Sequence, residues 1–370
     1  MIVKTASFRS KPRLTQRAFL AGCLALVPLL PLALMQSTDR PKEVVWGIIG
    51  CGDVVEKKSG PALQNAPRSR VAAVMRRDRA KAEDFARRHG IPRAYDDVDA
   101  LLADPEINAV YIATPPGSHL EIALKVAAAG YPLYVEKPAA RTAKECETMA
   151  QAFAKLPLFV AYYRRAYPRY VKLKQDLAAG RLGTIQSVSY VFARRPGPPR
   201  VGDWRLDAER SGGGKFVDIG SHALDLIDFL LGPLERVRAS ARGPAGQVET
   251  KVEMHFRIGK IDGTATWSFE ASESEDLLVI TGAEGSVRVP SAMNGRELVW
   301  ADGVESYDAP DPVQGPLVET VVNAILDGAD CPSTASSSKR TSRVIDDALG
   351  HYCGGRSDAF WSRPETWAAS

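Results

Sequence analysis

The chain has 370 residues, of which 45% are hydrophobic, 25% charged and 8% aromatic, with a formal net charge of +4. This composition excludes a disordered chain, a collagen, a coiled coil and a disulfide scaffold, and the length predicts two domains. Residues 1–40 hold six basic residues and one acidic residue, so the rest of the chain carries a net charge of −1. Without an excess of positive charge, no nucleic-acid partner is expected.

The first 40 residues resemble a targeting segment. Ala18–Met35 is a run of 18 uncharged, mostly apolar residues after a basic stretch, as in a signal peptide or a short membrane anchor. Thr15–Leu20 resembles the twin-arginine export motif, except that Gln16 replaces one arginine. A working leader predicts a periplasmic or membrane-anchored protein, with membrane contact only through residues 18–35. Translation from Met35 would instead leave a cytoplasmic enzyme.

The cysteines indicate neither a zinc site nor a disulfide framework, because none of them forms a CxxC pair. We expect no metal, and a disulfide between Cys331 and Cys353 stays open. The cysteines are Cys23, Cys51, Cys146, Cys331 and Cys353. The histidines without a partner in the sequence, read as structural, are His89, His255 and His351.

From Val44 onward, apolar β-branched runs alternate with helical patterns. This alternation at short spacing predicts a parallel, doubly wound α/β sheet. The predicted strands are Val44–Ile49, Val71–Met75, Ala109–Ala113 and Tyr131–Val135. The predicted helix signals are Arg79–His89, stopped by Gly90, and two capping boxes, Ser118–Glu121 and Thr142–Glu145.

The turn after the first strand has the pattern G-x-G-x-x-V. Gly50 and Gly52 let the backbone and a helix N-terminus approach a pyrophosphate, which indicates a dinucleotide site. Val55 stands where a third glycine or alanine is expected, so we expect looser packing of helix against strand. The residues of this turn that we assign to the dinucleotide are Gly50, Cys51, Gly52, Asp53 and Val54.

The end of the second strand bears on the choice of cofactor. Arg76 and Arg77 stand where an acidic residue would bind the ribose of NAD, and a guanidinium there favours the 2′-phosphate of NADP, with NAD still possible. In the alternative interpretation, Asp78 only caps the next helix and the two arginines are solvated.

Two later segments carry candidate catalytic groups. Lys137, between Glu136 and Pro138, follows the fourth strand, where its ammonium can stabilise charge on a substrate oxygen. Farther on, Ser211–Gly214 precedes a predicted helix over 215–231, in which Asp218, His222 and Asp225 share one face. Flanking carboxylates would favour the imidazolium and suit a general acid and base. A metal site or a satisfied polar patch are the alternatives.

The second half of the sequence is predicted to form a sheet, because apolar and polar residues alternate in it and β-branched residues are frequent. Its strands are Ser187–Phe192, Lys251–Arg257, Thr264–Phe269 and Leu277–Ile280, with a turn at Asp262-Gly263. Tyr163, Arg164 and Arg165 are expected to end a strand that leads into this half, and Trp204 with Arg205 lies in a Gly- and Pro-rich loop. Such side chains suit a hydroxyl-rich ring, or else the arginines are solvated and Trp204 anchors the loop. The segment after Cys353 is expected to be irregular surface.

The order of these motifs resembles the glucose-fructose oxidoreductase, inositol dehydrogenase and MocA family over about 44–355, with Glu136-Lys137-Pro138 and Asp218-x-x-x-His222 as its most specific parts. The resemblance implies a Rossmann domain and an α/β domain with a large, open, mostly antiparallel sheet. It also implies a homo-oligomer through that sheet. We place the leader and linker at 1–40, the Rossmann domain at 41–163, the substrate domain at 164–355 and a tail at 356–370.

The resemblance also implies roles for individual residues. Lys137 and His222 become the catalytic pair, and Asp218 a contact to the substrate or to His222. The cofactor contacts added are Thr114, Pro115, His119, Glu136 and Lys137, and the substrate contacts are Tyr163, Arg164, Trp204, Arg205, Asp218 and His222. The expected activity is NADP-dependent hydride transfer to or from a sugar, polyol or related cyclic alcohol or ketone. The alternatives are a trans-dihydrodiol dehydrogenase, an anhydrosugar reductase, or a nucleotide-binding regulator of the same fold.

Overall fold

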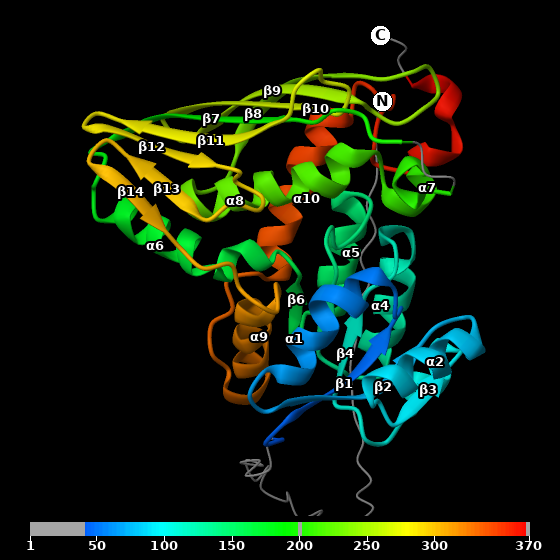
Figure 1. The fold of residues 1–370 in the computed structure, drawn as a ribbon. Coiled ribbons are helices and arrows are strands. Elements are labelled where there is room, and N and C mark those ends of the chain that lie inside the picture. Colours follow the sequence, from blue (N-terminus) through cyan, green and yellow to red (C-terminus); the bar gives the residue numbers. More distant parts are fainter. Residues whose placement is uncertain (1–40, 199–201, 368–370) are drawn as a thin grey trace, which may run out of the picture. The chain divides into compact units, whose positions relative to one another are not determined.

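The computed structural model describes residues 41–198 and 202–367. The predicted leader and the cysteine at position 23 lie outside the described residues. In the described part, six parallel strands form a first sheet in the order β3-β2-β1-β4-β5-β6 (Figure 1). These strands are β1 Val44–Ile49, β2 Ser69–Met75, β3 Arg93–Tyr95, β4 Ala109–Ile112, β5 Leu133–Val135 and β6 Leu158–Val160. The predicted doubly wound sheet is confirmed. The short strand β3 was not predicted, and β6 ends at Val160, before the strand end predicted at Tyr163–Arg165, which forms part of a 3₁₀ turn.

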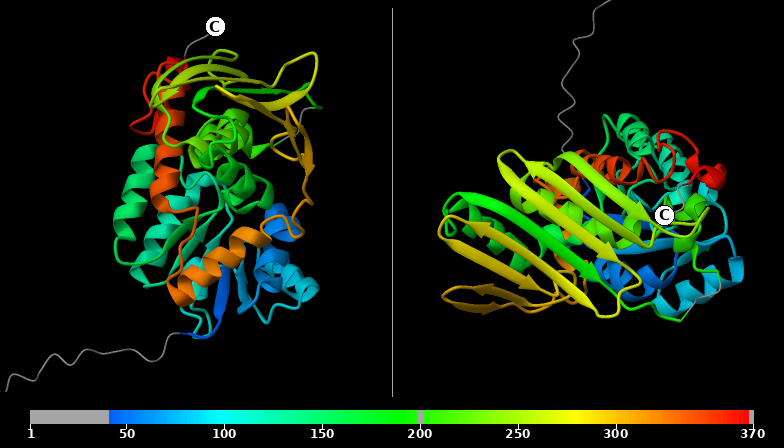
Figure 2. Two further views of the ribbon diagram at one scale, coloured as in Figure 1. Left: turned by 90° about the vertical axis from the view of Figure 1, so that its left-hand side faces the viewer. Right: turned by 90° about the horizontal axis from the view of Figure 1, so that it is seen from above.

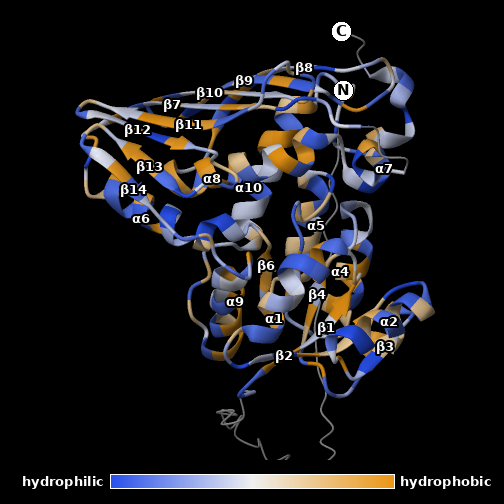
Figure 3. Ribbon diagram, in the orientation of Figure 1, coloured by the Kyte–Doolittle hydropathy of each residue, from blue (hydrophilic) through white to orange (hydrophobic). Residues whose placement is uncertain are grey.

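Helices cover both faces of the first sheet, because its central strands are apolar on both sides, as the orange β1 and β4 show in Figure 3. One face packs against α1 and α9, and the other against α3, α4 and α5. The helices of this half are α1 Gly60–Asn65, α2 Arg79–His89, α3 Val98–Leu102, α4 His119–Ala128 and α5 Ala143–Ala152. Helix α2 has the predicted bounds, and Gly90 ends it in the left-handed region at φ +64°.

Eight described strands form a second sheet in the order β14-β13-β12-β11-β7-β10-β9-β8 (Figure 2). Every neighbouring pair is antiparallel except β10 and β7. The strands are β7 Ile185–Ala193, β8 Glu235–Arg242, β9 Lys251–Ile258, β10 Ile261–Ser268, β11 Glu275–Gly282, β12 Gly285–Pro290, β13 Glu297–Trp300 and β14 Gly303–Ser306. The open, mostly antiparallel sheet is therefore confirmed, while a homo-oligomer through it stays a prediction.

The predicted turn at Asp262-Gly263 is wrong. Both residues lie inside β10, where they pair with Arg257 and Phe256 of β9. The chain turns earlier, at Gly259, which takes the left-handed region at φ +57°. Gly263 has a packing role instead, because a Cβ there would lie 2.2 Å from the ring of Phe256.

One face of the second sheet packs on three helices, α6 Pro168–Ala178, α8 Ser221–Leu231 and α10 Ala335–Leu349 (Figure 1). Helix α9, Gly315–Asp327, follows the second sheet in sequence but packs in the core of the first. A short helix, α7 Ala208–Ser211, precedes the glycines of the second half. No helix in the described ranges is both long and apolar enough to cross a membrane. The predicted domain boundaries stay predictions.

The predicted helix over 215–231 has two parts. Phe216–Gly220 forms a π-helical turn, and the α-helix α8 begins only at Ser221. The junction falls between Asp218 and His222, so the regular i, i+4 spacing assumed from the sequence does not hold there. Residues 356–367, expected to be irregular, contain two short 3₁₀ turns at Phe360–Ser362 and Pro364–Thr366, and Phe360 is completely buried.

Candidate active site

The two glycines of the turn after β1 have different structural roles. Gly50 has φ +97°, and a Cβ there would lie 2.8 Å from Thr114 Cγ2, so the neighbouring strand end requires this glycine. A Cβ added at Gly52 would meet no described atom within 4 Å, so the space above Gly52 is open to a ligand. Asp53 is exposed at the start of the helix. The turn therefore fits a pyrophosphate, with Gly52 as the position that lets it approach.

The looser packing expected at Val55 stays a prediction, and the structure shows a π-helical turn at this position. Val55 is completely buried, and the residues Val55–Ser59 form a π-helical turn before α1 begins. A π turn is wider than an α turn, so it accommodates a side chain larger than the expected glycine or alanine.

The structure confirms one part of the alternative interpretation of Arg76-Arg77-Asp78, the helix cap, and the binding of a 2′-phosphate stays a prediction. The Asp78 carboxylate accepts a hydrogen bond from Lys81 N at 3.1 Å and caps α2. Arg76 is exposed, but its Nη1 donates to the Cys51 carbonyl at 3.3 Å, which lays the guanidinium against the Gly-rich turn. Arg77 is exposed as well. A positive group therefore lies beside the place where an adenosine ribose would bind.

The predicted capping box at Ser118 is wrong. Its hydroxyl donates to Thr114 Oγ1 at 2.8 Å and to the Pro115 carbonyl at 3.0 Å, and it makes no cap for α4. The side chain instead fixes the loop after β4, which includes the predicted contacts Thr114 and Pro115. The capping box at Thr142 is half confirmed, since Thr142 accepts from Glu145 N at 3.1 Å but the Glu145 carboxylate turns to Arg141 N.

His119 connects two loops through its ring nitrogens and is not placed to contact a cofactor. The residue is completely buried, with Nε2 2.7 Å from the Thr114 carbonyl and Nδ1 3.2 Å from the carbonyls of Pro138 and Ala139. Burial lowers the pKa of His119. Its predicted cofactor contact is therefore corrected to a positioning role between the loops after β4 and β5.

Glu136 is also held by groups of the chain itself. Its Oε1 accepts from the Tyr111 hydroxyl at 2.8 Å and from Gln314 Nε2 at 2.7 Å, while its Oε2 accepts from Lys137 N at 3.1 Å. The carboxylate thus fixes the backbone from which Lys137 projects. Gln314 lies just before α9, and nothing in its local sequence indicated that it belongs here. Whether Glu136 also touches nicotinamide stays a prediction.

The structure brings Lys137 of the first half to Asp218 of the second. Lys137 Nζ donates to Asp218 Oδ1 at 2.5 Å and to the Asp218 carbonyl at 3.0 Å. Asp218 Oδ2 accepts from Arg205 Nε at 2.7 Å. Burial raises the pKa of the Asp218 carboxyl, but the charges of Lys137 and Arg205 outweigh it and lower the pKa to about 2. Asp218 is therefore a carboxylate at neutral pH, shared between two cations.

Arg205 in turn stacks on its neighbour, with its guanidinium 4.6 Å from the centre of the Trp204 ring. Both residues lie in a 3₁₀ turn, Trp204–Leu206, and both are partly exposed. Trp204 therefore lies beside the charged cluster through Arg205, which keeps the predicted substrate contact open.

His222 differs from its prediction. Neither Asp218 nor Asp225 forms a hydrogen bond with it, because Asp218 is held by Lys137 and Arg205, and Asp225 by Arg165. Its Nδ1 is buried and has no hydrogen-bond partner within the described ranges. The imidazolium is disfavoured, not favoured: burial lowers the pKa of His222 well below its usual value, helped by the positive charges of Arg164, Lys137 and Lys58.

The rings of Tyr162 and Tyr163 contact the imidazole edge-on, with centroids 6.0 and 5.1 Å from its own. The two arginines that follow are buried, so the solvated alternative is wrong. Arg164 Nε donates to the Met293 carbonyl at 3.1 Å. Arg165 pairs with Asp225 and Asp228, both at 2.8 Å, and has a structural role.

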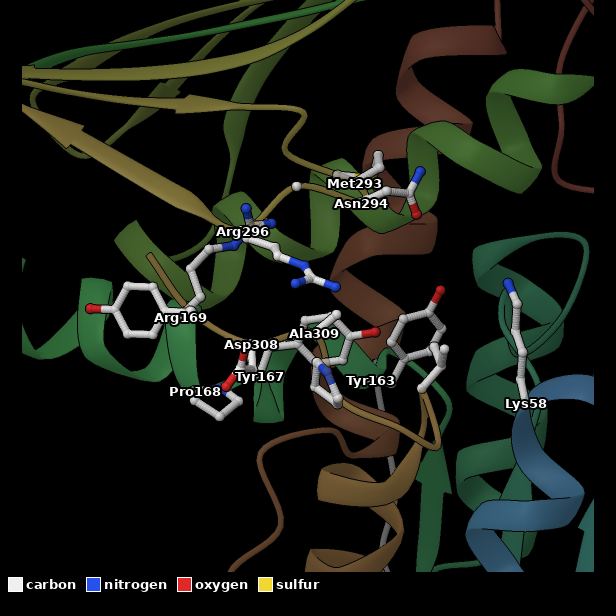
Figure 4. Close-up of a pocket in the computed structure, with 14 residues that line it drawn as sticks. Lys58, Tyr163, Tyr167, Pro168, Arg169, Met293, Asn294, Arg296, Asp308 and Ala309 are labelled. Carbon is white, nitrogen blue, oxygen red and sulfur yellow. The ribbon is translucent and has the colours of Figure 1, made fainter. Parts of the chain in front are cut away.

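A cleft of about 160 Å³ opens beside this cluster (Figure 4). Tyr163 lines the cleft, and its ring also contacts the His222 imidazole, so one side chain separates the cleft from His222. Most residues that line the cleft were not predicted from the sequence, including Lys58, Tyr167, Arg169 and the loop over 293–296. The pairing of Cys331 with Cys353, left open above, is not formed, since the described cysteines are free.

Two family models match the chain. The oxidoreductase family with an NAD-binding Rossmann fold matches residues 44–163, and the GFO/IDH/MocA C-terminal domain matches residues 170–288. Oxidoreductase P35 of Formosa agariphila is 34% identical over 312 residues, which cover 81% of this chain and 97% of that protein. The chain belongs to the Gfo/Idh/MocA family. The family is described as an oxidoreductase family with an NAD-binding fold, so the chain is an NAD(P)-dependent oxidoreductase.

Two further relatives carry more specific names. The trans-1,2-dihydrobenzene-1,2-diol dehydrogenase of Danio rerio is 29% identical over 72% of this chain and 80% of that protein. The D-xylose 1-dehydrogenase (NADP(+)) 2 of Haloferax volcanii is 30% identical over 82% of this chain and 95% of that protein. Among solved structures, a levoglucosan dehydrogenase in complex with NADH and levoglucosan superposes with a TM-score of 0.74 at 23% identity, covering 83% of this chain and 96% of the other.

Proposed function

We propose that the protein is an NADP-dependent oxidoreductase that transfers hydride between nicotinamide and a sugar, polyol or related cyclic alcohol or ketone. The observation that carries this proposal is the meeting of Lys137, at the carboxyl end of β5, with the segment that bears Asp218 and His222. A ligand crevice of an open α/β sheet lies at that edge. The relatives named for a dihydrodiol and for D-xylose support substrates that carry a secondary hydroxyl group.

The side chains suggest a division of labour during alcohol oxidation. The bound nicotinamide supplies the hydride acceptor. His222 is neutral at rest, so its imidazole can take the hydroxyl proton, and its neighbour Lys137 can donate a hydrogen bond to the oxygen on which negative charge develops. Asp218 holds Lys137 through two hydrogen bonds and so sets the direction of its ammonium.

The preference for NADP rests on Arg76, which lies against the Gly-rich turn. The D-xylose dehydrogenase relative, whose name includes NADP, supports it. We expect NADP to bind at least about tenfold more tightly than NAD, which corresponds to roughly 1.4 kcal/mol. Arg76→Asp should reverse the preference, and Arg87→Asp, a change of an exposed arginine on α2, should leave it in place. Equal affinities that neither variant changes would remove the proposal.

Export of the enzyme is a proposal that rests on the leader alone. An exported enzyme has no soluble NADP pool with which to exchange, so it would have to retain its cofactor and oxidise one substrate while reducing another. We expect tightly bound NADP to survive gel filtration and the mature chain to begin shortly after Met35. A cytoplasmic apo-enzyme that starts at Met35 and needs added NADP would contradict export and leave the catalytic proposal standing.

Native mass spectrometry of the purified protein tests the cofactor, and a panel of alcohols tests the activity. We expect reduced nicotinamide to form with at least one sugar, polyol or cyclic diol. A dihydrodiol accepted in preference to every sugar would favour the dihydrodiol dehydrogenase alternative. Dinucleotide binding without turnover on any alcohol would instead favour the nucleotide-binding regulator.

A further inference from the structure

Positive groups dominate the wall of the cleft beside His222. Three cationic side chains line it, Lys58, Arg169 and Arg296, against one acidic side chain, Asp308. Arg169 belongs to α6 and Arg296 follows β12, and Figure 4 shows both on the same side of the cleft. This surplus of positive charge lies next to the site where the substrate is expected, since Tyr163 lines the cleft and contacts His222.

Arg169 is buried and forms no ion pair with any residue that the structure describes. Only 3% of the residue is exposed, and its Nη2 donates to two uncharged oxygens, the Ala292 carbonyl at 3.1 Å and the Tyr170 hydroxyl at 2.5 Å. Its Nη1 is buried and has no hydrogen-bond partner in the part of the chain that the structure describes. An unpaired guanidinium inside a protein is costly, so an anion bound in the adjoining cleft would offset the buried positive charge of Arg169.

A second buried arginine lies behind the same loop. Arg164 donates to the Met293 carbonyl, and its Nη1 likewise has no partner within the described residues. The carboxylate that acts on both arginines, Asp276, is itself engaged, because it accepts from Met293 N at 2.8 Å and from the Tyr190 hydroxyl at 3.1 Å. The arginines and the lysine around the cleft therefore still outnumber the acidic groups when both Asp276 and Asp308 are counted.

The loop that presents Arg296 is fixed by these contacts. Ala292 and Met293 are held by the arginines through their carbonyls, and Ser291 takes the left-handed region at φ +48°. The Arg296 side chain itself is exposed. A fixed backbone with an exposed guanidinium suits recognition of a planar anion, because the fork of N–H donors matches a carboxylate in two places.

We propose that the substrate carries an anionic group, which Arg169 and Arg296 bind while the reacting hydroxyl lies at Lys137 and His222. This inference rests on the proposed function and narrows it to sugar acids, related hydroxy acids or their phosphorylated counterparts. A bound anion would also offset the positive charges of Arg164, Lys137 and Lys58 that surround His222.

Titration calorimetry on the full chain loaded with NADP⁺ tests the proposal with matched pairs. The pairs are D-glucuronate with D-glucose, D-galacturonate with D-galactose, D-gluconate with D-glucitol, and D-glucose 6-phosphate with D-glucose. We expect at least one acid to bind about tenfold or more tightly than its neutral counterpart, with an advantage that shrinks as salt is raised. A phosphate or a carboxylate preference then identifies the anion.

Arg296→Gln should remove most of that advantage and Arg296→Glu should reverse it, and neither change disturbs a buried contact. Arg288→Gln, an exposed arginine on β12, is the matched control and should change nothing. Equal binding of every acid and its neutral counterpart, no binding of any acid, or an advantage untouched by Arg296→Gln would overturn the proposal. Acid binding without reduction of the bound NADP⁺ would instead count against the proposed function alone.

Discussion

Two aspartates seven residues apart, Asp218 and Asp225, face opposite surroundings. Asp218 is shared between Lys137 of the first half and Arg205, and its side chain is partly exposed. Asp225 is bound by Arg165 through two hydrogen bonds at 2.8 Å and by the Thr341 hydroxyl at 3.3 Å, inside the protein. Their pKa values also shift in opposite directions: the cations lower the pKa of Asp218 to about 2, whereas burial raises the pKa of Asp225. Spacing along a helix therefore does not distinguish a site carboxylate from a structural one.

The comparison predicts its largest effect at Asp225. Asp225→Asn should destabilise the protein by about 3 kcal/mol or more, because it leaves the buried Arg165 short of a charge partner. The melting temperature should fall by about 6 °C or more. The protein that stays folded should keep its kcat, as thermal melts and steady-state kinetics on the same sample would show. An unchanged melting temperature would contradict the structural role.

Asp218→Asn should give the opposite pattern. The side chain keeps its shape but loses the charge that holds Lys137, so we expect kcat to fall at least about tenfold, or roughly 1.4 kcal/mol. The melting temperature should fall less than in Asp225→Asn, because the Lys137 and Asp218 side chains are 13% and 16% exposed, against 5% and 2% for Arg165 and Asp225. A loss of stability with full activity would exchange the roles of the two aspartates.

His222, between the two aspartates, makes a pH-dependent contribution. Its folded pKa is lowered, so its neutral form stabilises the fold fully above the unfolded pKa of about 6.5, and this contribution is lost as the pH falls. The wild type should therefore lose stability from about pH 7.5 to 5.5 more steeply than His222→Asn, by at most about 1.4 kcal/mol per pH unit. His119 remains in both proteins and cancels in the difference. Parallel curves would show that His222 is not buried neutral.

Elements whose signals lie within one short segment of the chain could be predicted from the sequence. Helix α2 has a side-chain cap, an apolar face and a terminal glycine within one short segment, and its bounds agree with the structure. Helices α9 and α10 also carry apolar residues at helical spacing, such as Leu317, Val318, Val321 and Val322, and this signal was available but not used. The turn at Asp262-Gly263 was misplaced because the same dipeptide also fits inside a strand where an aromatic ring crosses it.

The candidate site was only partly predictable for a physical reason. Lys137, Asp218 and His222 were named from their motifs, but their partners come from distant segments, as with Arg165 for Asp225 and Gln314 for Glu136. The charge state of His222 depends on burial and on cations from both halves of the chain. The spacing of residues along a helix does not contain that information. The flanking carboxylates therefore predicted a favoured imidazolium, whereas the pKa of His222 is lowered.

Single-turnover reduction of bound NADP⁺ tests most directly the claim that Lys137 and His222 act together on the substrate oxygen. Lys137→Met and His222→Asn should each slow this step by roughly 100-fold or more, the scale of a positioned acid or base. Affinity for NADP should be nearly unchanged, because we expect both groups to act mainly on the substrate oxygen. Full rate in either variant, or a loss explained entirely by weaker cofactor binding, would contradict the account.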